Sequence, residues 1–339
     1  MLNTFDIGEG EAEAALEQLY QSTSQQLTSI GKKHHTTLSD KEEYDKVCEE
    51  ANSLLKGEFV TGFPEVDTAF TAKGMTAKEL VVFKSRSGNC KTFTLVRLIV
   101  ENLKRGVRCY VLSPELAKDE FLYRVLITLY GGVGFDFSSA SKRFFDEYQK
   151  DKKLLEIEEG EELGRFSLDS IKRKALDIKA QLIVIDGLRY LVDPYSKISV
   201  PDQYGINCFN LLAFSKTYRI PVVVCVQENR SEGSLKVGNI SGSDQIAHTA
   251  TAIFGIKKDV VGGSQRIAFT TEKMRKGKEA LTFTYDWTYN NNSFTYVSCE
   301  QGYGRNTQPF EIEGPVLSEV LVNYSQNNPA GDMKVLDWG

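Results

Sequence analysis

The chain has 339 residues, 41% of them apolar and 26% charged, which excludes a mostly disordered protein and corresponds to one large domain with additions or to two modest ones. No apolar run approaches the roughly 18 residues that span a membrane, and the acidic stretch from Asp6 to Glu17 excludes a signal peptide. The net charge of −5 does not exclude a polyanionic partner, because residues 1–56 and 300–339 are acidic and leave residues 57–299 with a net charge of +5, although two solvated acidic ends explain this distribution equally well.

Two helices are predicted before residue 57. Apolar residues at roughly helical spacing indicate the first helix within the first 30 residues. The second helix, at residues 40–56, begins with the capping box Ser39–Glu42 and ends at Gly57. Its apolar stripe consists of Tyr44, Val47, Cys48, Ala51, Leu54 and Leu55. The two helices form no large core of their own, so we expect their apolar faces to pack on another surface.

From about residue 79, short apolar runs alternate with segments long enough for helices. The predicted strands are Leu80–Phe83, Val107–Leu112, Leu182–Ile185, Val222–Val226 and Ala252–Ile256. The predicted helices are Thr92–Lys104, Lys118–Tyr130, Leu168–Ala180 and Gln203–Tyr218. This alternation predicts an α/β fold with a mostly parallel sheet and helices on both faces. Arg266–Glu272 and Leu281–Tyr285 predict a C-terminal antiparallel hairpin.

The segment after the first predicted strand has the spacing of a Walker A loop, G-x-x-x-x-G-K-[ST]. In such a loop, backbone N–H groups surround a phosphate chain, a lysine reaches the β- and γ-phosphates, and a hydroxyl holds Mg²⁺. A side chain at the second framework glycine is strained by about 1–3 kcal/mol, so an ordinary strand–loop–helix connection explains the segment equally well. The segment consists of Ser85, Arg86, Ser87, Gly88, Asn89, Cys90, Lys91 and Thr92, with Ser85 and Cys90 at the positions of the two glycines.

Three more predicted strands end in polar side chains. Asp186 follows four apolar residues, the pattern of a Walker B aspartate that holds Mg²⁺. Glu115 follows the second strand, where a carboxylate activates the attacking water in an ATPase of this topology, and Gln227 ends the fourth. Taken alone, Asp186 is explained as an ordinary polar strand end and Glu115 as a surface charge, and Gln227 alone is uninformative. Because the carboxyl ends of parallel strands meet at one edge of a sheet, the strand ends together predict a site for ATP and Mg²⁺.

Several segments resemble DnaB-type replicative helicases of superfamily 4 and their RecA-like relatives. Thr61–Asp67 is similar to the T-G-F-x-x-L-D segment of that family, Leu112–Leu116 to its S-x-E-M segment, and Lys273–Gly277 to its K-x-R-x-G hairpin. Later family motifs resemble Leu182–Asp186, Ile220–Val223 and Gln227–Arg230. The resemblance covers residues 57–297. It implies N-terminal helices with a linker helix at 1–56, a RecA-like ATPase core at 57–299 and an acidic tail at 300–339.

The resemblance also implies an activity and the residues that perform it. The chain would be an ATP-dependent DNA helicase of replication that moves 5′→3′ on single-stranded DNA. Lys91 and Thr92 would bind phosphate and Mg²⁺, Asp186 would hold Mg²⁺ through water, and Glu115 would be the catalytic base. Gln227 would couple the γ-phosphate to the DNA loops.

A ring of six identical subunits is implied by two further segments. Lys273 and Arg275 would reach the nucleotide of the neighbouring subunit as trans-acting fingers, with a solvated hairpin tip as the less favoured alternative for both. The helix at 40–56 matches the linker helix, which docks on the adjacent subunit. DNA in the central channel would contact a loop similar to the S-G-S loop of the family, just before which Asn239 replaces an arginine of the family. The expected DNA-binding residues are Lys197, Lys236, Asn239, Ser241, Gly242 and Ser243.

Two other functions stay open. A RecA-like protein with weak or no ATPase, acting as a partner or regulator in replication or recombination, is favoured by Cys90 and by the lost arginine. The retention of Lys91, Thr92, Glu115 and Asp186 argues against it. The third is a recombinase or another RecA-like ATPase, because related ATPases also carry a K-x-R hairpin.

Three further features of the sequence concern the source of the protein, its cellular compartment and its partners. About 56 residues precede the core, which suggests a phage or mobile-element protein in a bacterial host. The six cysteines form no CxxC pair and no Cys/His cluster, so we expect free thiols, a cytoplasmic protein and no structural zinc. In the acidic tail, Trp338 either docks a polymerase, primase or loader or, as we slightly favour, packs on the core.

Overall fold

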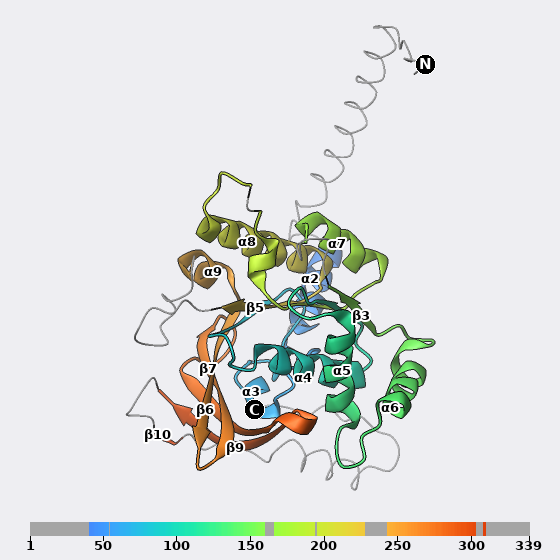
Figure 1. Cartoon of the computed structure of the whole chain (residues 1–339). Coiled ribbons are helices and arrows are strands. Elements are labelled where there is room, and N and C mark those ends of the chain that lie inside the picture. Colours follow the sequence, from blue (N-terminus) through green and yellow to red (C-terminus); the bar gives the residue numbers. More distant parts are fainter. Residues whose placement is uncertain are drawn as a thin grey trace, which may run out of the picture. The chain divides into compact units, whose positions relative to one another are not determined.

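The computed structural model describes residues 41–53, 55–159, 166–193, 195–227, 243–302 and 308–309 (Figure 1). The chain divides into two compact units, residues 1–53 and 54–339. In the first unit the described part is helix α2 (Lys41–Ser53), which corresponds to the second predicted helix, and Tyr44 and Val47 of its apolar stripe are exposed. The first predicted helix and the last thirty residues lie outside the described part. No described helix has the length and apolar character of a membrane-spanning segment.

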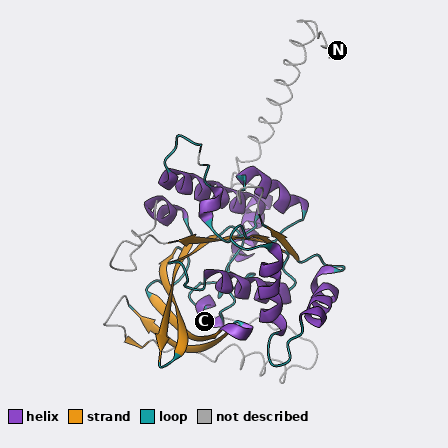
Figure 2. Cartoon of the chain, in the orientation of Figure 1, coloured by secondary structure: helices purple, strands orange, loops and turns teal. Residues whose placement is uncertain are grey.

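The second unit is built on one sheet, whose strands are orange in Figure 2. The sheet has ten strands in the order β10-β9-β8-β7-β6-β1-β5-β4-β2-β3. The parallel part consists of β1 (Leu80–Ser85), β2 (Cys109–Leu112), β3 (Leu155–Glu158), β4 (Leu182–Ile185), β5 (Val222–Gln227) and β6 (Ala252–Val261), which pairs in parallel with β1. The antiparallel part continues through β7 (Ser264–Met274), β8 (Leu281–Thr288), β9 (Ser293–Gln301) and β10 (Gln308–Pro309). The predicted α/β fold with a C-terminal antiparallel hairpin is therefore confirmed.

Helices cover both faces of the parallel strands (Figure 2). On one face, Val81 and Phe83 of β1 share an apolar cluster with residues of α4, α5 and α6. On the other, Leu80 and Val82 share a second cluster with residues of α7, α8 and α9. Because both faces are covered, all six residues of β1 are buried, which explains the continuous apolar run of its first four residues, Leu80–Phe83. The helices are α4 (Lys91–Lys104), α5 (Lys118–Tyr130), α6 (Phe137–Phe144), α7 (Leu168–Asp177), α8 (Val200–Tyr218) and α9 (Ser243–Thr249).

Several elements were not predicted. Strand β3 alternates two aliphatic side chains with two glutamates and lies at the edge of the sheet, so it lacks the apolar run of the central strands. Helix α6, α9, the last two strands and a π-helical turn at Phe145–Gln149 were also missed. The 3-10 helices at Leu188–Leu191 and Tyr289–Asn291 are too short to show a helical period.

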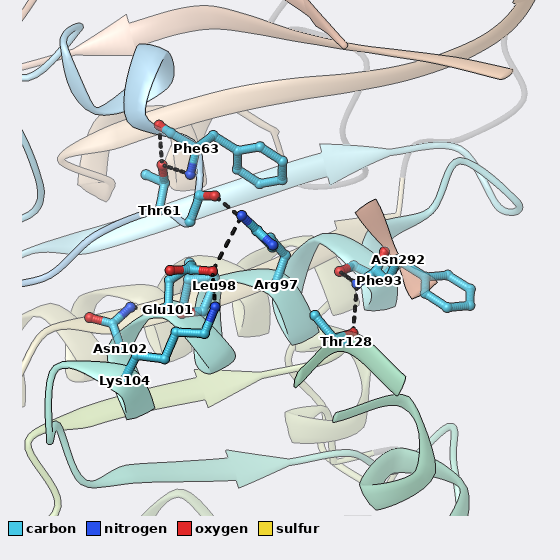
Figure 3. A network of polar contacts seen from close by, with 11 residues as sticks. Thr61, Phe63, Phe93, Arg97, Leu98, Glu101, Asn102, Lys104, Thr128 and Asn292 are labelled. Atoms are coloured by element: carbon cyan, nitrogen blue, oxygen red, sulfur yellow. Dashed lines mark hydrogen bonds and ion pairs between the residues drawn. The ribbon is translucent and has the colours of Figure 1, made fainter. Parts of the chain in front are cut away.

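The segment Thr61–Asp67 contacts α4, the helix that follows the predicted phosphate loop (Figure 3). Gly62 has φ +89°, and a Cβ there would lie 3.0 Å from the backbone of Arg97, so only glycine fits without strain. The Nε of Arg97 donates to the carbonyl of Gly62 (3.3 Å). Phe63 is buried, and the short helix α3 (Pro64–Asp67) follows it. These contacts give a structural reason for the glycine and the aromatic ring of this segment.

Asp67 predicts a pH dependence of stability. Burial raises the pKa of this carboxyl from 3.8 to about 7, although it accepts a hydrogen bond from the N–H of Thr61 (2.8 Å) that acts in the opposite direction. Between about pH 4 and pH 7 the folded state therefore binds more protons than the unfolded state. The free energy of unfolding falls as pH rises through this window, by at most about 1.4 kcal/mol per pH unit.

Asp67→Asn keeps the shape and the acceptor oxygen but does not titrate. We measure the free energy of unfolding of both proteins by urea titration. The value for the variant minus the value for wild type should increase steadily from pH 5 to pH 7, because wild type loses stability in this window through Asp67. A difference between the two proteins that does not change with pH would contradict the assignment of the proton to Asp67.

Candidate functional site

The predicted phosphate loop joins β1 to the N-terminus of α4. β1 ends at Ser85 and α4 begins at Lys91, so the loop lies where unpaired helix N–H groups favour an anion. Gly88 has φ +82° and Cys90 has φ +62°, both in the left-handed region. The Cys90 carbonyl accepts the N–H of Thr94 (2.9 Å) and so begins the first turn of α4. Cys90 thus adopts the backbone conformation for which the Walker A pattern uses glycine.

This geometry predicts that Cys90→Gly stabilises the protein. Glycine reaches the left-handed region freely, whereas an L side chain there costs about 1–2 kcal/mol. We expect Cys90→Gly to raise the free energy of unfolding by about 1 kcal/mol and to tighten nucleotide binding or raise turnover. Cys90→Ala is the matched control, because it removes the thiol and keeps the Cβ. If Cys90→Ala gains as much stability as Cys90→Gly, the backbone explanation is wrong.

Thr92 and Asp186, the two residues expected to hold Mg²⁺, are hydrogen-bonded to each other. Thr92 donates its hydroxyl to Asp186 Oδ2 (2.8 Å), and Asp186, at the end of β4, is 1% exposed. Burial raises the pKa of the Asp186 carboxyl to about 6, while the hydrogen bond from Thr92 lowers it. A hydroxyl and a carboxylate are ligands that suit Mg²⁺, which commonly takes one or two protein oxygens together with substrate phosphates. Within the described ranges, no three His, Cys, Asp or Glu side chains converge as a metal site.

The predicted polar residues of the strand ends line one pocket. Its volume is about 280 Å³, near the lower end of the roughly 300–1,000 Å³ of small-molecule sites. The structure therefore brings together Lys91, Glu115, Asp186 and Gln227, which are separated by up to 136 positions in the sequence. The lining residues are Lys91, Glu115, Asp186, Gly187, Leu188, Arg189, Tyr204, Cys225, Val226 and Gln227.

Arg189 is a pocket residue that the sequence analysis missed. It lies in the 3-10 helix after β4, and its Nη2 forms an ion pair with Glu115 Oε1 (2.7 Å). Its Nη1 donates to Gln227 Oε1 (3.3 Å). The sequence contained one signal for this residue. Arg189 lies three residues beyond Asp186, so it could be expected near the same edge of the sheet as the other strand ends.

The two predicted finger residues lie outside this pocket. Lys273, in β7, donates to the carbonyls of Ala247 and His248 at the end of α9, the latter at 3.3 Å. Arg275 also donates to the His248 carbonyl. Burial, followed by the charge of Arg275, lowers the pKa of Lys273. Their action on a neighbouring subunit stays a prediction.

The predicted DNA-binding residues are only partly described. Lys197 is exposed in the segment before α8, and Ser243 is the first residue of α9. Lys236, Asn239, Ser241 and Gly242 lie outside the described residues. The assignment of this group to DNA stays a prediction.

Comparison with known proteins gives a structural likeness without a sequence match. No protein-family model matches the chain, and no curated protein matches it either. The chain is similar to one solved structure that consists of an ATPase domain, with 16% identity, 75% of this chain and 96% of that chain covered, and a TM-score of 0.63. It is also similar to a DnaB-like replicative helicase whose structure was described with its interactions with primase, with 17% identity, 84% and 74% coverage, and a TM-score of 0.60. The core therefore has the RecA-like fold of DnaB-type helicase ATPase domains.

Proposed function

We propose that the chain is an ATP-hydrolysing DNA helicase of replication that works as a ring on single-stranded DNA. The observation that carries this proposal is the convergence of Lys91, Glu115, Asp186 and Gln227 on one pocket at the carboxyl ends of the parallel strands. The likeness of the fold to DnaB-type ATPase domains supports it. ATP is the substrate in this proposal and Mg²⁺ its cofactor.

Binding of the triphosphate depends on the loop and on the beginning of α4. The helix N-terminus and the ammonium group of Lys91 attract the phosphates, because both present positive charge to the pocket. Thr92 and Asp186 would hold Mg²⁺, which neutralises phosphate charge when bound. The hydrogen bond between these two side chains aligns their oxygens in advance.

Glu115 supplies the base in the proposed mechanism. Glu115 lines the pocket and is exposed to solvent. In the proposed mechanism its carboxylate accepts the proton of the attacking water. Gln227, at the end of β5 on the other side of β4, presents an amide that senses the γ-phosphate. β5 leads directly into the segment from Lys236 to Ser243, which contains all the expected DNA-binding residues except Lys197, so Gln227 connects the pocket to that segment along the chain.

Ring formation would complete the site. Lys273 and Arg275 do not line the pocket of their own chain, which supports their use by a neighbouring subunit. The exposed stripe of α2 would dock on that neighbour, since each large apolar side chain fully removed from water contributes about 1.5–3 kcal/mol. We propose a homo-hexamer, formed with nucleotide or DNA. A primase, polymerase or loader would be the partner of the tail in the alternative in which Trp338 does not pack on the core.

A mixing experiment tests the shared site. Arg275→Ala should keep assembly and nucleotide binding and lose most hydrolysis, and Lys91→Ala should be inactive for a different reason. In mixed rings, some interfaces pair the intact loop of one variant with the intact finger of the other, so activity should reappear. Mixtures that co-assemble and stay as inactive as either parent would overturn the model of fingers acting in trans.

A second candidate function is a RecA-like partner or regulator with weak or no hydrolysis. The left-handed conformation of Cys90 favours it, because a side chain stands where the phosphate loop needs glycine. Nucleotide binding without hydrolysis by the folded protein would support this candidate.

A further inference from the structure

The guanidinium of Arg189 joins two side chains that come from different strands. Arg189 follows β4, Glu115 follows β2, and Gln227 ends β5. In the sheet, β4 lies between β5 and β2. Arg189 therefore extends from the middle strand to both neighbours, with its two terminal nitrogens directed to different partners, Nη2 to Glu115 Oε1 (2.7 Å) and Nη1 to Gln227 Oε1 (3.3 Å).

The local chain holds this guanidinium in place. Its carbon lies 4.7 Å from the centre of the Tyr190 ring, and Nη2 also donates to the Tyr190 hydroxyl. Tyr190 folds back over Gly187, where an added Cβ would lie 2.8 Å from the ring. Gly187 also has φ +119°, which an L side chain rarely adopts. Glycine directly after Asp186 thus makes room for the ring that supports Arg189.

We propose that Arg189 is a positioning residue of the ATPase site, which fixes the base Glu115 and the sensor Gln227 relative to each other. This inference rests on the proposed function. Because Arg189 holds Oε1 of Glu115, the other carboxylate oxygen is the one that takes the proton of water. The same guanidinium also binds the amide of Gln227. A movement of this amide therefore moves the guanidinium and with it the carboxylate of Glu115. Glu115 and Gln227, which are separated by 112 positions in the sequence, then act as one unit.

The test separates positioning from nucleotide contact. We expect Arg189→Ala to lower kcat by about 10- to 100-fold while KM for ATP and the affinity for a fluorescent nucleotide analogue stay within about threefold. Arg189→Lys keeps the charge but cannot form both contacts, so it should recover only part of the loss. Arg173→Ala, an exposed arginine on α7 that does not line the pocket, is the matched control. Unchanged thermal unfolding of each variant shows that folding is intact.

Double variants test the coupling. Arg189→Ala combined with Gln227→Ala should lose little more than the worse single variant, and Arg189→Ala added to Glu115→Gln should cost almost nothing. Additive losses, an unchanged kcat in Arg189→Ala, or a loss confined to nucleotide affinity would each overturn the positioning role while wild type hydrolyses ATP. A folded wild-type protein without any hydrolysis would instead overturn the proposed function, and this inference with it.

Discussion

Lys91→Ala is expected to abolish ATP hydrolysis. Lys91 is the first residue of α4 and lines the pocket, and its Nζ donates to the carbonyl of Arg86 at the long distance of 3.4 Å. The ammonium group can therefore turn to a phosphate at little cost. Removing a positive group that stabilises developing charge typically lowers kcat by about 10²–10³-fold. Steady-state phosphate release, with and without single-stranded DNA, measures the effect.

Lys104→Ala is the control for this variant. Lys104 lies in the last turn of the same helix and forms a surface ion pair with Glu101 (2.9 Å). Such exposed pairs contribute little to stability, so this variant should hydrolyse ATP like wild type. If Lys91→Ala also retained wild-type hydrolysis, the assignment of the phosphate loop would be wrong.

Glu115→Gln is expected to retain nucleotide and to lose most hydrolysis. The substitution keeps the shape of the side chain and removes the proton acceptor, and loss of a general base typically costs about 10²–10⁴-fold in rate. Nucleotide affinity should change little, because Glu115 is an anion on the wall and contributes no attraction to phosphate. Rapid-mix hydrolysis and equilibrium binding of a nucleotide analogue measure the two quantities separately.

Glu156→Gln provides the comparison for Glu115→Gln. Glu156 lies on the edge strand β3, forms a surface ion pair with Lys174 (3.5 Å) and does not line the pocket. Its loss should leave hydrolysis and binding unchanged. Parallel losses of binding and hydrolysis in Glu115→Gln would mark Glu115 as a structural residue of the pocket wall.

The central strands were predictable because burial on both faces requires consecutive apolar residues, which are recognisable in the sequence. Leu80–Phe83 of β1 and all four residues of β4 are buried, and each of these stretches is an unbroken apolar run followed by a polar residue. The outer strands leave a weaker trace. Beyond Ile256, β6 continues to Val261 as an exposed hairpin arm paired with β7, and no apolar run marks this extension.

The candidate site was predictable for the residues that end strands and not for Arg189. Glu115, Asp186 and Gln227 each follow a recognisable apolar run. The role of Arg189 depends on the order of the strands, because it bridges its two partners only if β4 lies between β5 and β2. That order follows from pairings distant in sequence, which no local pattern contains.

The most direct test of the central claim is the ATPase rate of the wild-type protein over a range of protein concentrations, with and without single-stranded DNA. The account predicts hydrolysis whose rate per subunit rises as subunits assemble and rises again when DNA is added, because the fingers and the DNA-binding segment act between subunits. A folded, assembled protein that hydrolyses no ATP with or without DNA would contradict it.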